Sequence, residues 1–163
     1  MRKLLSITAC AAAFFALSLP VSANGAGAVN FTQTFHNAVQ TMPSSNPCTG
    51  APGIVTITYN GVAHATFLTS GVGAGTGWET FTATGEFAFV PADPSQPSFS
   101  GKFTTWDGDN ENLRNFTTTA TFSLRGTGSD GSTLNFHDVA HITILNPLTN
   151  PTIVVSFDKF SCN

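Results

Sequence analysis

Apolar and polar residues alternate along much of the chain beyond residue 28, with the period of two that is typical of β-strands. Segment 133–145 is the clearest case, because its apolar residues fall at even positions from Leu134 to Ile144. Segment 113–125 follows the same even-numbered pattern. No stripe with the 3.6-residue period of a helix occurs after the first 23 residues, so the pattern predicts an all-β domain.

Clusters of Gly, Pro, Asn, Asp and Ser separate the alternating segments and predict turns. These clusters lie at 60–61, 71–77, 91–97, 107–110, 128–131 and 146–151. The strands predicted between them are 54–59, 62–69, 79–90, 98–106, 113–125, 133–145 and 152–160, with an eighth at 29–39. Such short connections favour an antiparallel meander, and we expect an eight-stranded up-and-down β-barrel, with a two-sheet β-sandwich as the alternative.

The alternation also predicts how the last long hairpin is paired. A three-residue loop at 129–131, with glycine in the left-handed conformation, keeps the apolar faces of 113–125 and 133–145 together and places Phe122 opposite Asp138. The same register pairs Leu124 with Phe136 and Ala120 with Ala140.

The first 23 residues have the features of a secretory signal, with basic residues before an apolar stretch and small residues before the cleavage point. We therefore expect a signal peptide at 1–23, a secreted protein, and a single all-β domain at 24–163. That domain carries four basic and nine acidic residues, a net charge near −5, with no basic run. This charge argues against nucleic acid or an anionic membrane as a partner.

The exported domain keeps two cysteines, Cys48 and Cys162. Disulfides persist outside the cell, so we expect these two residues to be joined. The bridge would fasten the first edge of the sheet to the last.

The histidines of segment 133–145 do not form a zinc motif. Residues four apart in a strand lie about 13 Å apart, too far for His137 and His141 to hold one zinc ion. Both fall on the odd-numbered, polar face.

Asp138 stands instead on the apolar face, where an unpaired carboxylate is costly. A two-residue turn at Asn60-Gly61 would place Ile57 opposite His64 and turn His64 inward as well. The candidate His64–Asp138 pair would be either a structural hydrogen bond or a catalytic acid/base dyad. The alternative is that Asp138 turns outward at a bulge or bonds a backbone group.

Two loop segments invite comparison with ligand sites. The glycine-rich stretch 71–77 lacks the residues of a phosphate-binding loop, and we expect a plain loop there. Asp107, Asp109 and Glu111 occupy every second position within 106–112. This segment is either an acidic hairpin turn or a set of candidate calcium ligands. The sequence predicts no cofactor.

Several longer stretches resemble small secreted β-rich proteins of unknown function from actinobacteria. They are NPCTGAPGIVTITYNGV (46–62), TGEFAFVP (84–91), SGKFTTWDGDN (100–110), RGTGSDGSTLNFHDVAHITI (125–144) and SFDKFSC (156–162). The resemblance implies secretion and a β-domain containing both cysteines, but no activity. At the level of fold alone, secreted barrels such as lipocalins, dirigent proteins and allene oxide cyclases are similar in length and strand number.

Three hypotheses of function follow. The first is a non-enzymatic exported domain whose phenylalanine-rich interior binds a small apolar ligand. The second is a structural or interaction protein with a packed core, and the third is a lyase- or isomerase-like enzyme using His64 and Asp138. The residues predicted to line the interior are Phe81, Phe87, Phe103, Phe116, Phe122, Phe136 and Ile142.

Overall fold

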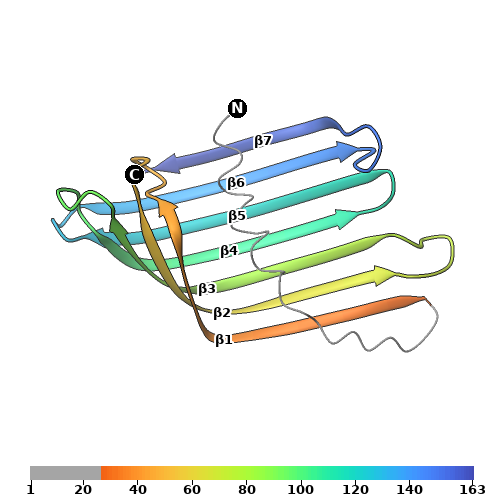
Figure 1. The fold of residues 1–163 in the computed structure, drawn as a ribbon, viewed down its shortest axis with the longest axis horizontal. Helices are drawn as coiled ribbons and strands as arrows, with labels where there is room; N and C mark the ends of the chain where they lie inside the picture. The colour runs from red at the N-terminus through yellow and green to blue at the C-terminus, as the bar shows by residue number, and fades with distance from the viewer. Residues whose placement is uncertain (1–26) are drawn as a thin grey trace.

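The computed structural model describes residues 27–163, which form one antiparallel sheet of seven strands in sequence order (Figure 1). The strands are β1 (Ala28–Ser45), β2 (Pro52–Leu68), β3 (Gly77–Pro91), β4 (Phe99–Glu111), β5 (Asn115–Gly128), β6 (Thr133–Leu145) and β7 (Thr152–Cys162). Over these residues no helix is long and apolar enough to cross a membrane. The all-β meander is therefore as predicted, whereas the signal predicted at 1–23 lies outside the described residues.

The sheet is not closed into a barrel. β1 and β7 are its two edge strands, and no ladder joins them within residues 27–163. The eight-stranded barrel is therefore not confirmed, and the sheet has seven strands rather than eight because two of the predicted strands are one.

That merged strand is β2, which runs without interruption through Asn60 and Gly61. The predicted hairpin there is wrong. Pairing with β1 on one side and β3 on the other holds these residues extended, and Gly61 lies opposite Phe35 and Ala83. The Asn60 side chain instead contacts β1 at a bend, where its Oδ1 accepts a hydrogen bond of 3.0 Å from the backbone N–H of Asn37.

At this bend β1 and β2 turn out of the plane of the sheet and run toward the C-terminal end of β7 (Figure 1). β1 accommodates the bend through a register shift between Phe35 and Ala38, with Asn37 at a φ of 48°. The cross-strand row through Gly61, Thr105 and Asp138 divides the sheet. On one side of this row, β1 and β2 fold over the other strands, and we call this part of the sheet the closed half. We call the rest of the sheet the open half.

The hydrophobic core lies on the face of the sheet that we call the inner face, in the closed half and at its border. It consists of Tyr59, Ala83, Phe87, Phe89, Phe99, Phe103, Leu124, Leu134 and Phe136, none of them more than 9% exposed. Aromatic contacts run through it from strand to strand, with ring centroids 6.1 Å apart for Phe103–Phe122 and for Phe122–Phe136. The seven residues predicted to line the interior all lie on this inner face.

Two inner-face glycines allow neighbouring strands to coil closely in the closed half. A Cβ on Gly85 would collide with the carbonyl oxygen of Thr58 on β2, and one on Gly101 with that of Arg125 on β5. Glycine within a strand commonly marks such a close backbone approach.

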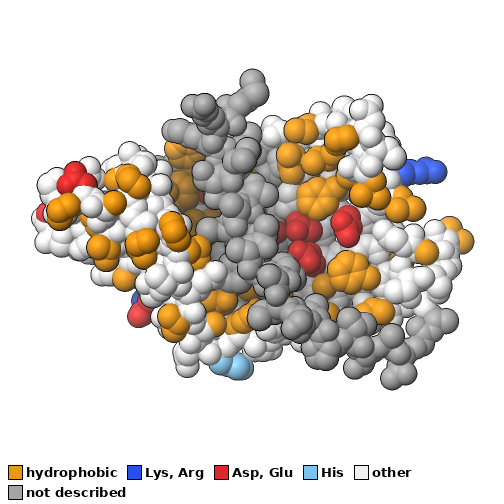
Figure 2. Space-filling model, in the orientation of Figure 1, with side chains coloured by type: hydrophobic (Ala, Val, Ile, Leu, Met, Phe, Trp, Pro, Cys, Tyr) orange, Lys and Arg blue, Asp and Glu red, His pale blue; other side chains and the backbone are white. Residues whose placement is uncertain are grey.

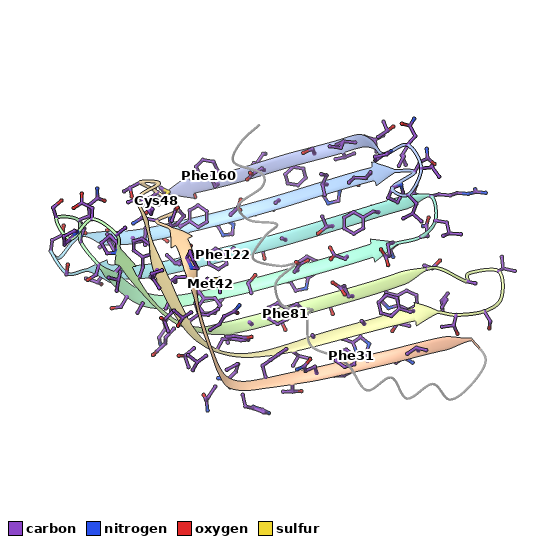
Figure 3. All side chains as sticks on the ribbon, viewed as in Figure 1. Phe31, Met42, Cys48, Phe81, Phe122 and Phe160 are labelled. Atoms are coloured by element: carbon purple, nitrogen blue, oxygen red, sulfur yellow. A yellow bond between two sulfur atoms is a disulfide. The ribbon has the colours of Figure 1, made fainter. Side chains whose placement is uncertain are left out.

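The predicted disulfide is present. Cys48, in the loop between β1 and β2, is bonded to Cys162 at the end of β7, with the Cα atoms 5.7 Å apart. Figure 3 labels Cys48 beside the end of β7. The two edges of the sheet are thus fastened covalently where no ladder joins them.

The predicted register of the β5–β6 hairpin is confirmed. Phe122 lies opposite Asp138, Leu124 opposite Phe136 and Ala120 opposite Ala140. The Gly128 N–H donates to the Ser132 carbonyl at 2.7 Å, and Gly131 has a φ of 84°, which is the expected three-residue loop.

Candidate functional site

The outer face of the sheet carries three histidines, each bonded to a hydroxyl group on the next strand. His137 Nδ1 lies 2.7 Å from Ser123 Oγ, and His141 Nδ1 lies 2.7 Å from Thr119 Oγ1. The His141 ring also stacks on Phe157 of β7, with centroids 5.5 Å apart. These contacts place both histidines on the polar face, as predicted.

His64 lies on this outer face too, and not on the inner face where a turn at Asn60-Gly61 would have placed it, so the candidate His64–Asp138 pair does not form. Because β2 continues through Asn60-Gly61, His64 lies opposite Thr32 of β1, and its Nδ1 is 2.8 Å from Thr32 Oγ1. Asp138 belongs to the inner face, between Phe136 and Ala140. The sheet separates the two side chains, and the acid/base dyad that the enzyme hypothesis required does not form.

Asp138 is buried on the inner face, with only 2% of its surface exposed. Phe122 and Phe160 lie directly opposite it on β5 and β7. Burial, with a hydrogen bond to Asp158 and the Asp158 charge as further causes, raises the pKa of Asp138 to about 6. Asp138 therefore keeps its proton to a higher pH than an exposed aspartate does.

A second carboxyl pair joins β3 and β4. Glu79 lies directly opposite Asp109, and burial raises the pKa of Glu79 to about 7, with further contributions from the charge of Asp109 and a hydrogen bond to it. Asp107 lies next along the inner face of β4, and burial, with the nearby Asp109 charge, raises its pKa to about 6.

Asp107, Asp109 and Glu111 therefore do not form the predicted turn at 107–110. They are part of β4, which pairs with β3 and β5 as far as Glu111, and their alternation points all three toward the inner face. Among residues 27–163, no group of three or more His, Cys, Asp or Glu side chains is arranged to hold a metal ion. This arrangement does not support the alternative interpretation of Asp107, Asp109 and Glu111 as calcium ligands.

Charge is strongly segregated between the two faces. Six of the nine acidic residues fall on the inner face, namely Glu79, Asp107, Asp109, Glu111, Asp138 and Asp158. The basic residues Lys102, Arg125 and Lys159 fall on the outer face, and Arg114 lies in the turn after β4. Figure 2 shows the acidic side chains gathered among apolar ones on the face turned toward the viewer.

Apolar side chains border these acids in the open half. Phe116, Ile142 and Ile144 are half-buried on the inner face of β5 and β6, and Ile153 of β7 is 60% exposed. Phe122 and Phe160, labelled in Figure 3, continue the apolar border toward the closed half. The open half of the inner face therefore combines unfilled apolar surface with carboxyl groups. We call this surface, with its carboxyl groups, the acidic site.

Comparison with protein-family models, with curated proteins and with solved structures finds no match to the chain. The resemblance to secreted actinobacterial proteins therefore stays a prediction.

Sequence reasoning found Asp107, Asp109, Glu111 and Asp138 but missed Glu79 and Asp158, their partners across the sheet. The alternation along β7 could have placed Asp158 on the inner face. Its contact with Asp138 is a diagonal one, however, and depends on the β6–β7 register.

Proposed function

We propose that the protein is an exported, non-enzymatic binding domain that holds a small ligand with an apolar body on the open half of its inner face. One observation carries the proposal: the inner face is filled by core side chains in the closed half, whereas in the open half it leaves Phe116, Ile142 and Ile153 partly exposed beside carboxyl groups. Ligand sites are commonly apolar surfaces with a few polar groups that fix orientation.

Export is supported by two features. The Cys48–Cys162 disulfide is consistent with an extracellular protein, and the first 23 residues have the composition of a secretory signal. The inner face of the open half lies on the opposite side of the sheet from His64, His137 and His141, which supports binding rather than acid/base catalysis.

A neutral solvatochromic dye such as Nile red tests the proposal, because its fluorescence increases in an apolar site. Ile142→Thr removes apolar surface from the inner face, and Val62→Thr removes it from the outer face, where Val62 is 40% exposed. Both substitutions keep a β-branched residue. We expect Ile142→Thr to weaken dye binding by up to about tenfold and Val62→Thr to leave it unchanged. Equal effects of the two substitutions would contradict the proposal.

The second candidate function is self-association through β7, and the exposure of this edge strand favours it. Val155 and Phe157 of β7 are 45% and 42% exposed, and the strand pairs only with β6 among the described residues. Long apolar edge strands readily pair with other chains. Light scattering over a range of concentrations tests this candidate: a dimer that Val155→Lys converts to a monomer supports it, and a monomer at every concentration contradicts it.

A further inference from the structure

The acidic site contains two carboxyl pairs held apart by small side chains. Glu79 and Asp109 face each other across β3 and β4, and Asp138 and Asp158 are diagonal neighbours across β6 and β7. One cross-strand row runs between them, from Asp107 through Ala120 and Ala140 to Asp158. At about 4.8 Å per strand, this row spans roughly 14 Å along the sheet.

No basic side chain of residues 27–163 lies on this face to neutralise these acids. The basic residues are on the outer face or, in the case of Arg114, in the turn at the end of β4. Like charges gathered on one surface repel each other and destabilise the fold unless a cation or a proton compensates them. The raised pKa values of Glu79, Asp107 and Asp138 are the effect expected where protons take that role.

Buried oxygen atoms in both carboxyl pairs, and in Asp107 beside them, lack hydrogen-bond donors. Asp138, at 2% exposure, has an Oδ1 with no partner in the described chain, and the same holds for Oδ1 of Asp107, Asp109 and Asp158. A buried acceptor without a donor is costly. An ammonium group offers three N–H donors together with the compensating charge.

From this geometry we propose that the acidic site binds an aliphatic diamine or polyamine, with one ammonium group received by each carboxyl pair. The methylene chain between the ammonium groups would lie over the small side chains of Ala120 and Ala140. Phe122 and Phe160 lie opposite Asp138 on the neighbouring strands, where aromatic rings would add a cation–π contact. This inference depends on the proposed function, because it names the ligand class of the same site.

An organic cation fits the site better than a metal ion does. Calcium requires six to eight oxygen ligands, whereas the β6–β7 end offers only the Asp138–Asp158 pair, and the four acids at the β3–β4 end are spread along two strands. Across the described residues no set of three or more acidic, His or Cys side chains has the arrangement of a metal site.

Titration calorimetry on the exported, disulfide-bonded chain at pH 8 tests the inference with 1,8-diaminooctane and, as a neutral analogue of the same length, octane-1,8-diol. We expect the diamine to bind at least about tenfold more tightly than the diol, since charge-assisted hydrogen bonds are the stronger kind. Asp138→Asn and Asp109→Asn, one in each carboxyl pair, should each weaken diamine binding by about tenfold. Asp93→Asn alters an acid in the loop between β3 and β4 and should have no effect.

Other outcomes would overturn the inference in distinguishable ways. If the diol and Nile red bind as tightly as the diamine, the ligand is apolar but not cationic, and only the proposed function survives. If neither the dye nor the diamine binds, both proposals fail. If Ca²⁺ binds and the diamine does not, the acids form a metal site instead.

Discussion

At the scale of single residues, acidic side chains on the sheet and in the loops have opposite effects on stability. Burial and neighbouring carboxyl groups raise the pKa of Asp138, so the negative charge is disfavoured in the folded protein. In the loop after β5, hydrogen bonds from the Ser132 side chain and backbone lower the pKa of Asp130, so its charge is favoured. Ionised Asp138 thus opposes folding at neutral pH, whereas ionised Asp130 supports it.

The direction of the pH dependence follows from these pKa values. Unfolded carboxyl groups lose their protons near pH 4, whereas Asp107 and Asp138 in the folded chain lose theirs at about pH 6 and Glu79 at about pH 7. Between these limits the folded chain binds more protons, so the free energy of unfolding decreases as the pH rises. We expect a higher Tm at pH 5 than at pH 8.

Asp138→Asn should separate this effect from other titrations. The amide cannot ionise, so the variant should have a higher Tm than the parent at pH 8 and a smaller difference between pH 5 and pH 8. Asp130→Asn, which removes a carboxylate stabilised by Ser132, should lower the Tm at pH 8. Circular-dichroism melts at constant ionic strength measure both. A parent Tm that rises with pH between 5 and 8 would contradict the assignment.

At the scale of elements, strand coiling depends on glycine at positions where two backbones come close. Gly85→Ala and Gly101→Ala would each place a methyl group against a carbonyl oxygen of the next strand. Because backbone atoms cannot move aside as a flexible side chain can, we expect each variant to lose about 1–3 kcal/mol of unfolding free energy.

Gly108→Ala is the matched control for these variants. A Cβ at Gly108 would meet only the ring of Trp106, which is 39% exposed and free to shift. Urea denaturation compares the three variants. A loss for Gly108→Ala as large as that for Gly85→Ala would mean that strand propensity, rather than close approach, explains the result.

How well the elements could be predicted depended on whether the decisive contacts were local. The β5–β6 register followed from a three-residue loop and the alternation beside it, and both are visible in one stretch of sequence. Asn60-Gly61 has the same composition as a turn, but pairing with β1 and β3 keeps it extended. Likewise, Asp107 and Asp109 resemble turn residues until β3 and β5 are placed beside them. Only tertiary contacts distinguish these cases.

At the scale of the whole molecule, the two halves of the sheet are held by different means. The closed half has the aromatic core, and the disulfide fastens the folded-over β1–β2 connection to the end of β7. The open half has neither, and depends on its ladders and on small clusters such as the hydroxyl–histidine bonds of His64 and His141 on the outer face. The acidic site occupies the half that is held less tightly.

This division predicts what loss of the disulfide should do. The bridge closes a loop of 114 residues, and removing such a native disulfide typically costs about 2–5 kcal/mol of unfolding free energy. The double variant Cys48→Ser/Cys162→Ser should show this loss in urea denaturation. Hydrogen exchange should increase mainly in residues 38–45 and 52–60, which fold over the core, while β4 to β6 stay protected. Nile red binding should persist at urea concentrations below the new denaturation midpoint, because the open half contains no part of the bridge. If the variant instead fails to bind Nile red, the two halves of the sheet do not act independently.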